Sequence, residues 1–159
     1  MIALEIAIGI ALCGVLILSS YLITLFIEAL RLRPHPNARA LEYSEEHVLP
    51  RLKVNEREGV RRYSFVRQTS LVLLTADATL LAATDGISLS TVAEALLTTF
   101  GSMLLFAHIV PNLLITRSSG RWALPFVPIA RVLFWVIQPF VLLTGFVASV
   151  AELGNGSAD

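Results

Sequence analysis

Charged residues and cysteines are both scarce in this chain, and the scarcity restricts the kind of protein it encodes. Charged residues make up 15% of the sequence and hydrophobic residues 55%, and the mean hydropathy is +0.74. A soluble domain of this size would be left with too little polar surface. The net charge is zero, so no general basic field favours nucleic acid as a partner. Cys13 is the single cysteine, so no internal disulfide can form.

The signatures of soluble enzymes are missing as well. The sequence has no phosphate-binding P-loop, no GxGxxG, no GxSxG and no HExxH. Its histidines, His35, His47 and His108, do not have zinc-site spacing. A membrane enzyme with Asp77 and His108 as acid and base is conceivable, but nothing in the sequence marks a substrate pocket. We therefore expect that this protein is not an enzyme and binds no organic cofactor.

Long apolar runs are present instead. Ile6–Ile27 contains 22 residues without a charge, enough for a helix rising about 1.5 Å per residue to cross a core of about 30 Å. No basic segment precedes this run, and Arg31 and Arg33 follow it at once. It therefore reads as a retained transmembrane helix, about residues 3–30, rather than a cleaved signal peptide.

The segment after the first helix carries most of the positive charge. Residues 31–67 hold nine of the twelve Lys and Arg residues. The positive-inside rule places this segment in the cytoplasm and the N-terminus outside. Within residues 31–62 we expect short juxtamembrane helices, and a solvated charged loop is the alternative.

Two further spans are predicted, at about residues 63–84 and 92–113, with a turn at Asp85-Gly86 between them. The next apolar segment, about residues 122–153, is ambiguous. Val132–Ala151 is uncharged and long enough to cross, but three prolines interrupt the segment and Arg131 and Gln138 make it partly amphipathic. It is either a fourth crossing or a belt along the interface. Residues 154–159 form a polar tail. The fold class is an all-α membrane protein, one domain over residues 1–153.

Polar residues recur at helical spacing inside the predicted spans. They form one stripe on each helix: Ser20, Thr24 and Glu28; Ser70, Asp77 and Thr84; Gly101, His108 and Asn112. A charge near the bilayer centre costs at least a few kcal/mol, so Asp77 and His108 point to an internal site. The alternative is structural: an Asp77–His108 pair that holds helices together, with hydroxyls bonded to their own helix.

Pro111 adds oxygen ligands to this prediction. A proline removes a backbone donor and frees nearby carbonyls, and Asn112 is expected to cap the broken helix end. Freed carbonyls beside a carboxylate are hard ligands that suit Mg²⁺ or another small cation with several waters retained.

Several short segments resemble the transmembrane domain of the CNNM/CorC family of magnesium transporters. That family shows G-E-[IV]-[IL]-P-K, then R-x-A-L, then P-hydrophobic-hydrophobic-R-hydrophobic-hydrophobic-[YF]-W. The corresponding segments here are His108–Asn112, Arg121–Leu124 and Pro128–Trp135. Ser20 and Thr24, followed by an R-x-R at residues 31–33, are similar to the family's F-S-x-x-E-T-A…R-x-R, and Leu73–Asp77 to its I-L-I-G-N.

The resemblance implies an ion site and a set of departures from it. Carried across by motif, the site consists of Ser20, Asp77, His108 and the backbone carbonyl of Leu114, supported by Thr24, Pro111 and Asn112. His108 replaces the family's glutamate, Asp77 its asparagine and Asn112 its lysine, so the carboxylate has moved from the third helix to the second. The imidazole suits a different ion, a proton-linked role or loss of transport.

The resemblance also implies partners and a location. We expect the lipid bilayer and a second copy of the chain as partners, and a CBS-containing region or protein outside this chain. The expected location is the inner membrane of a bacterium. The leading hypothesis is transport of Mg²⁺ or another divalent cation. The alternative is a non-transporting membrane structural or interaction protein with a buried Asp–His pair.

Overall fold

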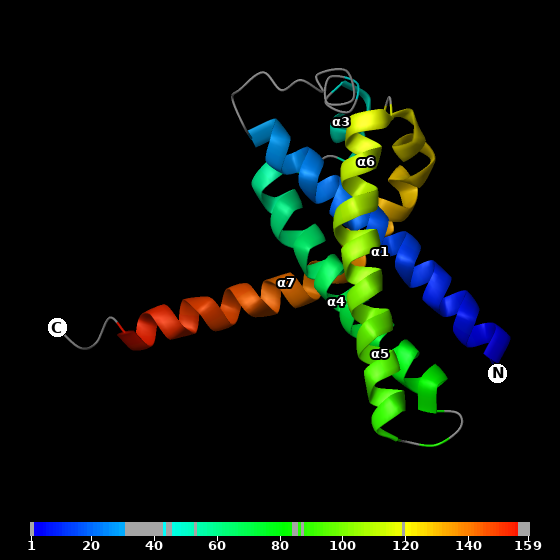
Figure 1. The fold of residues 1–159 in the computed structure, drawn as a ribbon. Coiled ribbons are helices and arrows are strands. Elements are labelled where there is room, and N and C mark those ends of the chain that lie inside the picture. The colour runs from blue at the N-terminus through cyan, green and yellow to red at the C-terminus, as the bar shows by residue number, and fades with distance from the viewer. Residues whose placement is uncertain are drawn as a thin grey trace.

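The computed structural model describes residues 2–30, 43, 46–52, 54–83, 86, 88–118 and 120–155. Within these ranges every regular element is a helix and there is no strand. The elements are α1 (Ile2–Leu30), α3 (Leu49–Leu52), α4 (Glu56–Ala82), α5 (Leu89–Ser102), η2 (Met103–Ile109), α6 (Val110–Arg117), η3 (Arg121–Phe126) and α7 (Val127–Asn155). Figure 1 shows α1 packed on α4, with α5, η2 and α6 joined into one long rod.

Three stretches of the described helices are long and apolar enough to cross a membrane. They are Ala3–Ala29, Leu89–Arg117 and Arg121–Leu143. The chain is therefore an all-α membrane protein, as the sequence predicts. The first two stretches agree with the expected first and third spans.

The expected second span is a helix, but it is longer than predicted at its start. α4 begins at Glu56 rather than at about Tyr63, and it is not one of the three stretches above. Its first half carries Arg57, Arg61, Arg62 and Arg67, which lower its mean hydropathy. Its second half is apolar apart from hydroxyls and Asp77, and this half packs between α1 and α5.

The segment after the third span is a short 3-10 helix followed by one long α-helix. Pro125 lies in η3, before α7 begins. Pro139 lies inside α7 without ending it, contrary to the expected interruption. Figure 1 shows α7 leaving the bundle sideways, so that its C-terminal part extends away from the other helices. This arrangement suits a belt, while the length and composition of α7 also suit a crossing.

The third span also differs from the prediction at its proline. Pro111 does not end the helix, because the π-helical turns of η2 precede it and α6 continues to Arg117. A proline lacks an N–H and its ring clashes with the carbonyl four residues earlier. The wider π-helix, with i→i+5 bonds, accommodates both defects. Asn112 therefore caps no helix end and lies exposed on α6.

The main core lies where α1 meets the first half of α4. Tyr21, Phe26 and Tyr63 are fully buried there, and the rings of Phe26 and Tyr63 stack with centroids 5.9 Å apart. Gly59 permits this approach, because a Cβ on Gly59 would lie 2.7 Å from the Phe26 ring. The hydroxyl of Tyr63 donates a hydrogen bond of 3.2 Å to the carbonyl of Ala130 and so fixes α7 to α4.

The remaining predictions concern the loops. Gly86 has a φ of +106° and donates to the carbonyl of Ala83 at 3.1 Å, which confirms a turn there. Ser88 then caps α5 by accepting a hydrogen bond from the backbone of Thr91. α3 is a single turn of the expected juxtamembrane helices, and residues 31–42 lie outside the described residues. The predicted tail begins later than expected, since α7 runs to Asn155.

Candidate functional site

The second half of α4 brings Asp77 to the wall of a cleft. The cleft has a volume of about 800 Å³ and lies between the first half of α1, the second half of α4, and the α5–η2 rod. Asp77 is only 8% exposed although its carboxylate lines this space. Two members of the stripe predicted on the second helix are confirmed to share a buried face, because Ser70, two turns earlier, is buried as well. Thr84, the third member, lies outside the described residues.

A glycine on α1 makes room for this carboxylate. A Cβ on Gly9 would lie 2.9 Å from Oδ2 of Asp77. Cβ atoms essentially never approach that closely, so a side chain at position 9 would force the carboxylate of Asp77 to shift. Neither a hydrogen bond nor an ion pair to Asp77 is found in the described part of the chain. The carboxylate is therefore buried without a partner among the residues that the structure describes.

Further polar groups line the cleft on the opposite wall. Glu94, Thr98 and Ser102 lie four residues apart on α5, so they share one face of that helix. Cys13 lines the α1 side, one turn after Gly9. Together these groups give the cleft two carboxylates, two hydroxyls and a thiol from three helices. No group of three His, Cys, Asp or Glu side chains close enough to hold a metal ion directly occurs among the described residues.

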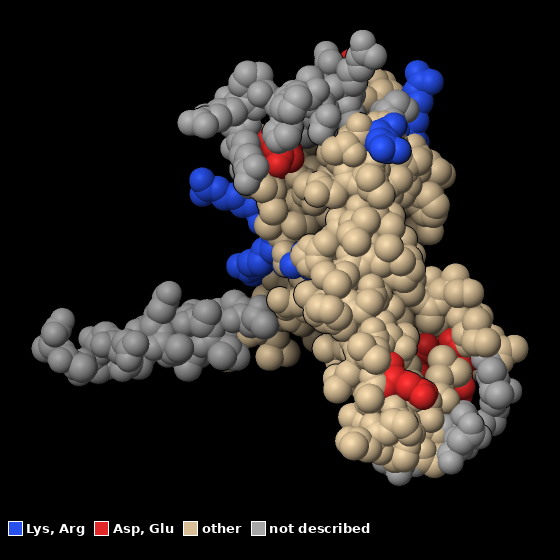
Figure 2. All heavy atoms as spheres, viewed as in Figure 1, with Lys and Arg blue, Asp and Glu red and all other residues tan. Residues whose placement is uncertain are grey.

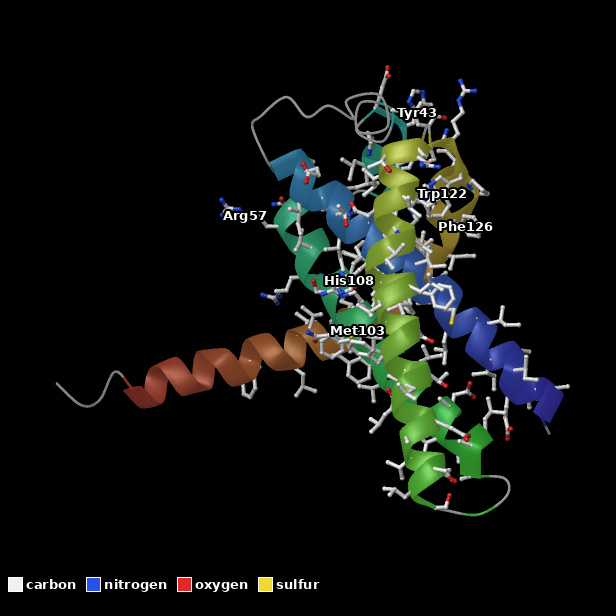
Figure 3. The ribbon with its side chains drawn as sticks, in the orientation of Figure 1. Tyr43, Arg57, Met103, His108, Trp122 and Phe126 are labelled. Carbon is white, nitrogen blue, oxygen red and sulfur yellow. The ribbon has the colours of Figure 1, made fainter. Side chains whose placement is uncertain are left out.

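His108 lies outside the cleft. It is exposed, and its neighbours Phe106 and Ala107 are the residues that turn inward, Phe106 into the cleft and Ala107 into the core. Figure 3 shows His108 at mid-height on the long rod, above the end that holds the cleft. The structure describes both His108 and Asp77 and contains no ion pair between them. The structural Asp77–His108 pair therefore has no geometric support.

The other residues expected from the resemblance are also outside the cleft. Ser20 is 2% exposed in the core, and its hydroxyl has no hydrogen-bond partner among the described residues. Thr24 donates to the carbonyl of Ser20 at 3.0 Å, which is the i−4 bond considered for such hydroxyls. The carbonyl of Leu114 already accepts the backbone N–H of Ser118 at 3.0 Å, and Pro111 is buried. Of the four predicted ligands, only Asp77 lines this cleft.

Gly9, Glu94, Thr98 and Ser102 were not singled out by the sequence reasoning. Their signal was nevertheless present. Glu94, Thr98 and Ser102 recur every four residues from the start of the third span, and Gly9 and Cys13 have the same spacing on the first. A carboxylate near a predicted helix end, small hydroxyls and a glycine are all common in membrane helices, so this spacing alone does not predict a site.

Charge is divided between the two ends of the molecule. The cleft end carries Glu5, Asp77 and Glu94, and no Lys, Arg or His lines the cleft. The described arginines lie on α3, the first half of α4, the end of α6, and the start of η3 and α7. In Figure 2 one acidic group is visible at the lower right and another at the upper left, and the Lys and Arg side chains visible in that view all lie above the lower-right group.

No family model, curated protein or solved structure matches the chain. Function is therefore inferred from the cleft, the charge distribution and the membrane-spanning helices.

Proposed function

We propose that this membrane protein binds a divalent cation in the cleft at Asp77 and carries it across the bilayer. The observation that carries the proposal is a buried carboxylate that has no hydrogen bond or ion pair to any described residue and faces a cavity among helices of a membrane protein. Burying an ionisable group inside a membrane protein costs free energy, and the residues that do so usually have a function. Mg²⁺ keeps several waters and is commonly held by one or two carboxylates, so it does not need three protein ligands close together. Asp77 and Glu94 supply that number.

The charge distribution supports an orientation. The arginine-rich end faces the cytoplasm by the positive-inside rule, which places the cleft in the outer half of the protein and the N-terminus outside. A cation arriving from outside would meet Glu94, which is exposed, before Asp77, which is buried. Residues that repel a cation are absent from the lining of the cleft. We place the protein in a bacterial inner membrane on the resemblance to CNNM/CorC.

A second copy of the chain is part of the proposal. Gly101, His108 and Asn112 are all exposed on the long rod, so the polar stripe predicted there faces away from the bundle. Polar side chains on the outside of a membrane helix gain from a polar partner, and a small residue lets another backbone approach. A homodimer would supply both. A CBS-containing partner remains an expectation from the resemblance.

The test is the thermal stability of the purified protein against Mg²⁺, Mn²⁺, Co²⁺ and Zn²⁺. A ligand at one hundred times its Kd stabilises the folded state by about 2.7 kcal/mol, so a saturable rise in Tm is expected. Asp77→Asn keeps the shape and removes the charge, and it should abolish the rise. Glu46→Gln is the matched control, because Glu46 is exposed at the other end. If Asp77→Asn kept the rise in Tm, Asp77 would not be part of the cation site. Flux of the same cation into liposomes tests transport separately.

A further inference from the structure

The walls of the cleft are suited to an apolar ligand. Three isoleucines of α1 line one side, two leucines of α4 the second, and one aromatic ring of η2 the third: Ile6, Ile10, Ile17, Leu74, Leu81 and Phe106. A hydrated metal ion gains nothing from such walls. An apolar group gains roughly 25 cal/mol for each Å² removed from water.

The only buried charge in the lining is negative. Asp77 is 8% exposed, faces the cavity, and has no hydrogen bond or ion pair to any described residue. The described residues of the lining include no Lys, Arg or His that would neutralise it. Coulomb attraction grows as the surrounding dielectric falls, so a cation beside this carboxylate is held more strongly than in water. The cleft thus selects its occupant by the sign of the charge.

The size of the cavity narrows the ligand class further. Its volume of about 800 Å³ lies within the range of about 300–1,000 Å³ typical of small-molecule pockets. Such pockets are mostly apolar with a few placed polar groups, which is the composition found here. A single small ion would leave most of this space to lipid or water. A larger cation with an apolar body would use both the charge and the walls.

We infer that the cleft between α1, α4 and α5 binds an amphiphilic organic cation, with the cationic centre beside Asp77 and the apolar body against the isoleucine and leucine walls. The inference rests on the proposed function in that both place a cation at Asp77. It differs in the class of cation, because it requires the apolar walls and a divalent ion does not. No covalent step is involved.

The probe is tetraphenylphosphonium, with tetraphenylborate as an ion of the same shape and opposite sign. Equilibrium dialysis of the purified protein should show saturable binding of tetraphenylphosphonium and none of tetraphenylborate above detergent background. Asp77→Asn should weaken tetraphenylphosphonium binding about tenfold or more, equivalent to 1.4 kcal/mol. Equal binding of both ions, or binding that Asp77→Asn leaves unchanged, would overturn the inference.

Gly9→Ala provides a second variant that changes the site without removing the carboxylate. The new Cβ would meet Oδ2 of Asp77 at 2.9 Å, and the end of that side chain can shift. The helix itself should tolerate alanine well. We expect weaker tetraphenylphosphonium binding, whereas Gly14→Ala, whose Cβ would meet nothing within 4 Å, tests the effect of added volume alone. Unchanged binding in Gly9→Ala would contradict a cationic centre at this carboxylate.

The two proposals fail in different ways. Asp77-dependent stabilisation by a divalent ion without tetraphenylphosphonium binding would keep the proposed function and refute the organic cation. Tetraphenylphosphonium binding without any stabilisation by a divalent ion would support the organic cation and refute the proposed function. Competition between Mg²⁺ and tetraphenylphosphonium on the unaltered protein tests whether the two ions share a site. If both bind without competing, the organic cation does not lie at Asp77.

Discussion

The two ends of the α1–α4 pair use glycine for opposite purposes. At the arginine-rich end Gly59 lets α4 approach α1 until the Phe26 ring fills the space above it. At the acidic end Gly9 makes room for a carboxylate, and the helices leave a cleft beside it. The same helix pair is thus a packed core at one end and the wall of an open cleft at the other. In both places a glycine lets another group come close to the helix backbone. The kind of group differs: an aromatic ring packs the core at Gly59, and a carboxylate lies at the cleft beside Gly9.

Polar groups follow the same division. Arg62 at the packed end is buried, forms an ion pair with Glu58 one turn earlier, and stacks 4.1 Å above the ring of Phe134. Asp77 at the cleft end is equally buried and has no such partners among the described residues. Buried charge is stable in proteins when it is paired. The paired Arg62 is therefore a structural charge, whereas Asp77, unpaired among the described residues, is the charge that we propose binds a ligand.

The largest expected effect breaks the packed end. Gly59→Ala places a methyl group 2.7 Å from a fully buried ring that cannot move aside. Overpacking of this kind costs about 1–3 kcal/mol, so the Tm should fall clearly. Gly14→Ala makes the same chemical change where no atom lies within 4 Å, and its Tm should stay level or rise. Equal Tm changes in both variants would show that the packed end is looser than described.

An intermediate effect is expected at the contact between α4 and α7. Tyr63→Phe removes the hydrogen bond to the carbonyl of Ala130 and keeps the ring. Such a buried hydrogen bond contributes about 1 kcal/mol to the free energy of unfolding. Tyr43→Phe is the matched change near the surface and should alter that free energy by less than about 0.5 kcal/mol. Chemical or thermal unfolding in detergent measures both, and a larger loss in Tyr43→Phe would place the anchor of α7 elsewhere.

The smallest effect is expected from a substitution on the long rod, outside the cleft. His108→Ala should leave the cation-induced rise in Tm unchanged, because His108 is exposed and does not line the cleft. The same titration on Asp77→Asn gives the contrast, since that variant loses the rise. If His108→Ala also lost it, the ligand set implied by the resemblance would be right and the cleft would not be the site.

Much of the helical layout could be predicted from the sequence, while the direction of each polar face could not. Charge-free runs and the turn at Gly86 predict the first and third spans closely, because length and hydropathy decide them. Periodicity correctly groups Ser70 with Asp77, and Gly101 with His108 and Asn112. The first group is buried and the second exposed. In a membrane chain both inward and outward faces are largely apolar, so hydropathy does not orient a helix.

The structure differs from the sequence prediction at two places, the early start of α4 and the continuous helix through Pro111, and the physical reasons differ. Up to residue 62 the sequence predicts short juxtamembrane helices or a charged loop, separate from the second span. In the structure α4 is one helix from Glu56, and its packing against α1 supports this charged first half. Pro111 predicts a helix end, and the π-helical turns before it absorb the defect instead. In both cases the helix depends on residues other than the one that signals its end, so single-residue signals miss both.

The π-helical turns of η2 also have a consequence for how this sequence can change over generations. A π segment holds one residue more than an α-helix of the same shape needs, so Met103–Ile109 is a place where a deletion would shorten the chain and leave the rod intact. Loss of that residue would turn η2 into an ordinary α-helix and keep α5 and α6 in register. Glu94, Thr98 and Ser102 would therefore still face the cleft, and this segment could change in length without changing that wall.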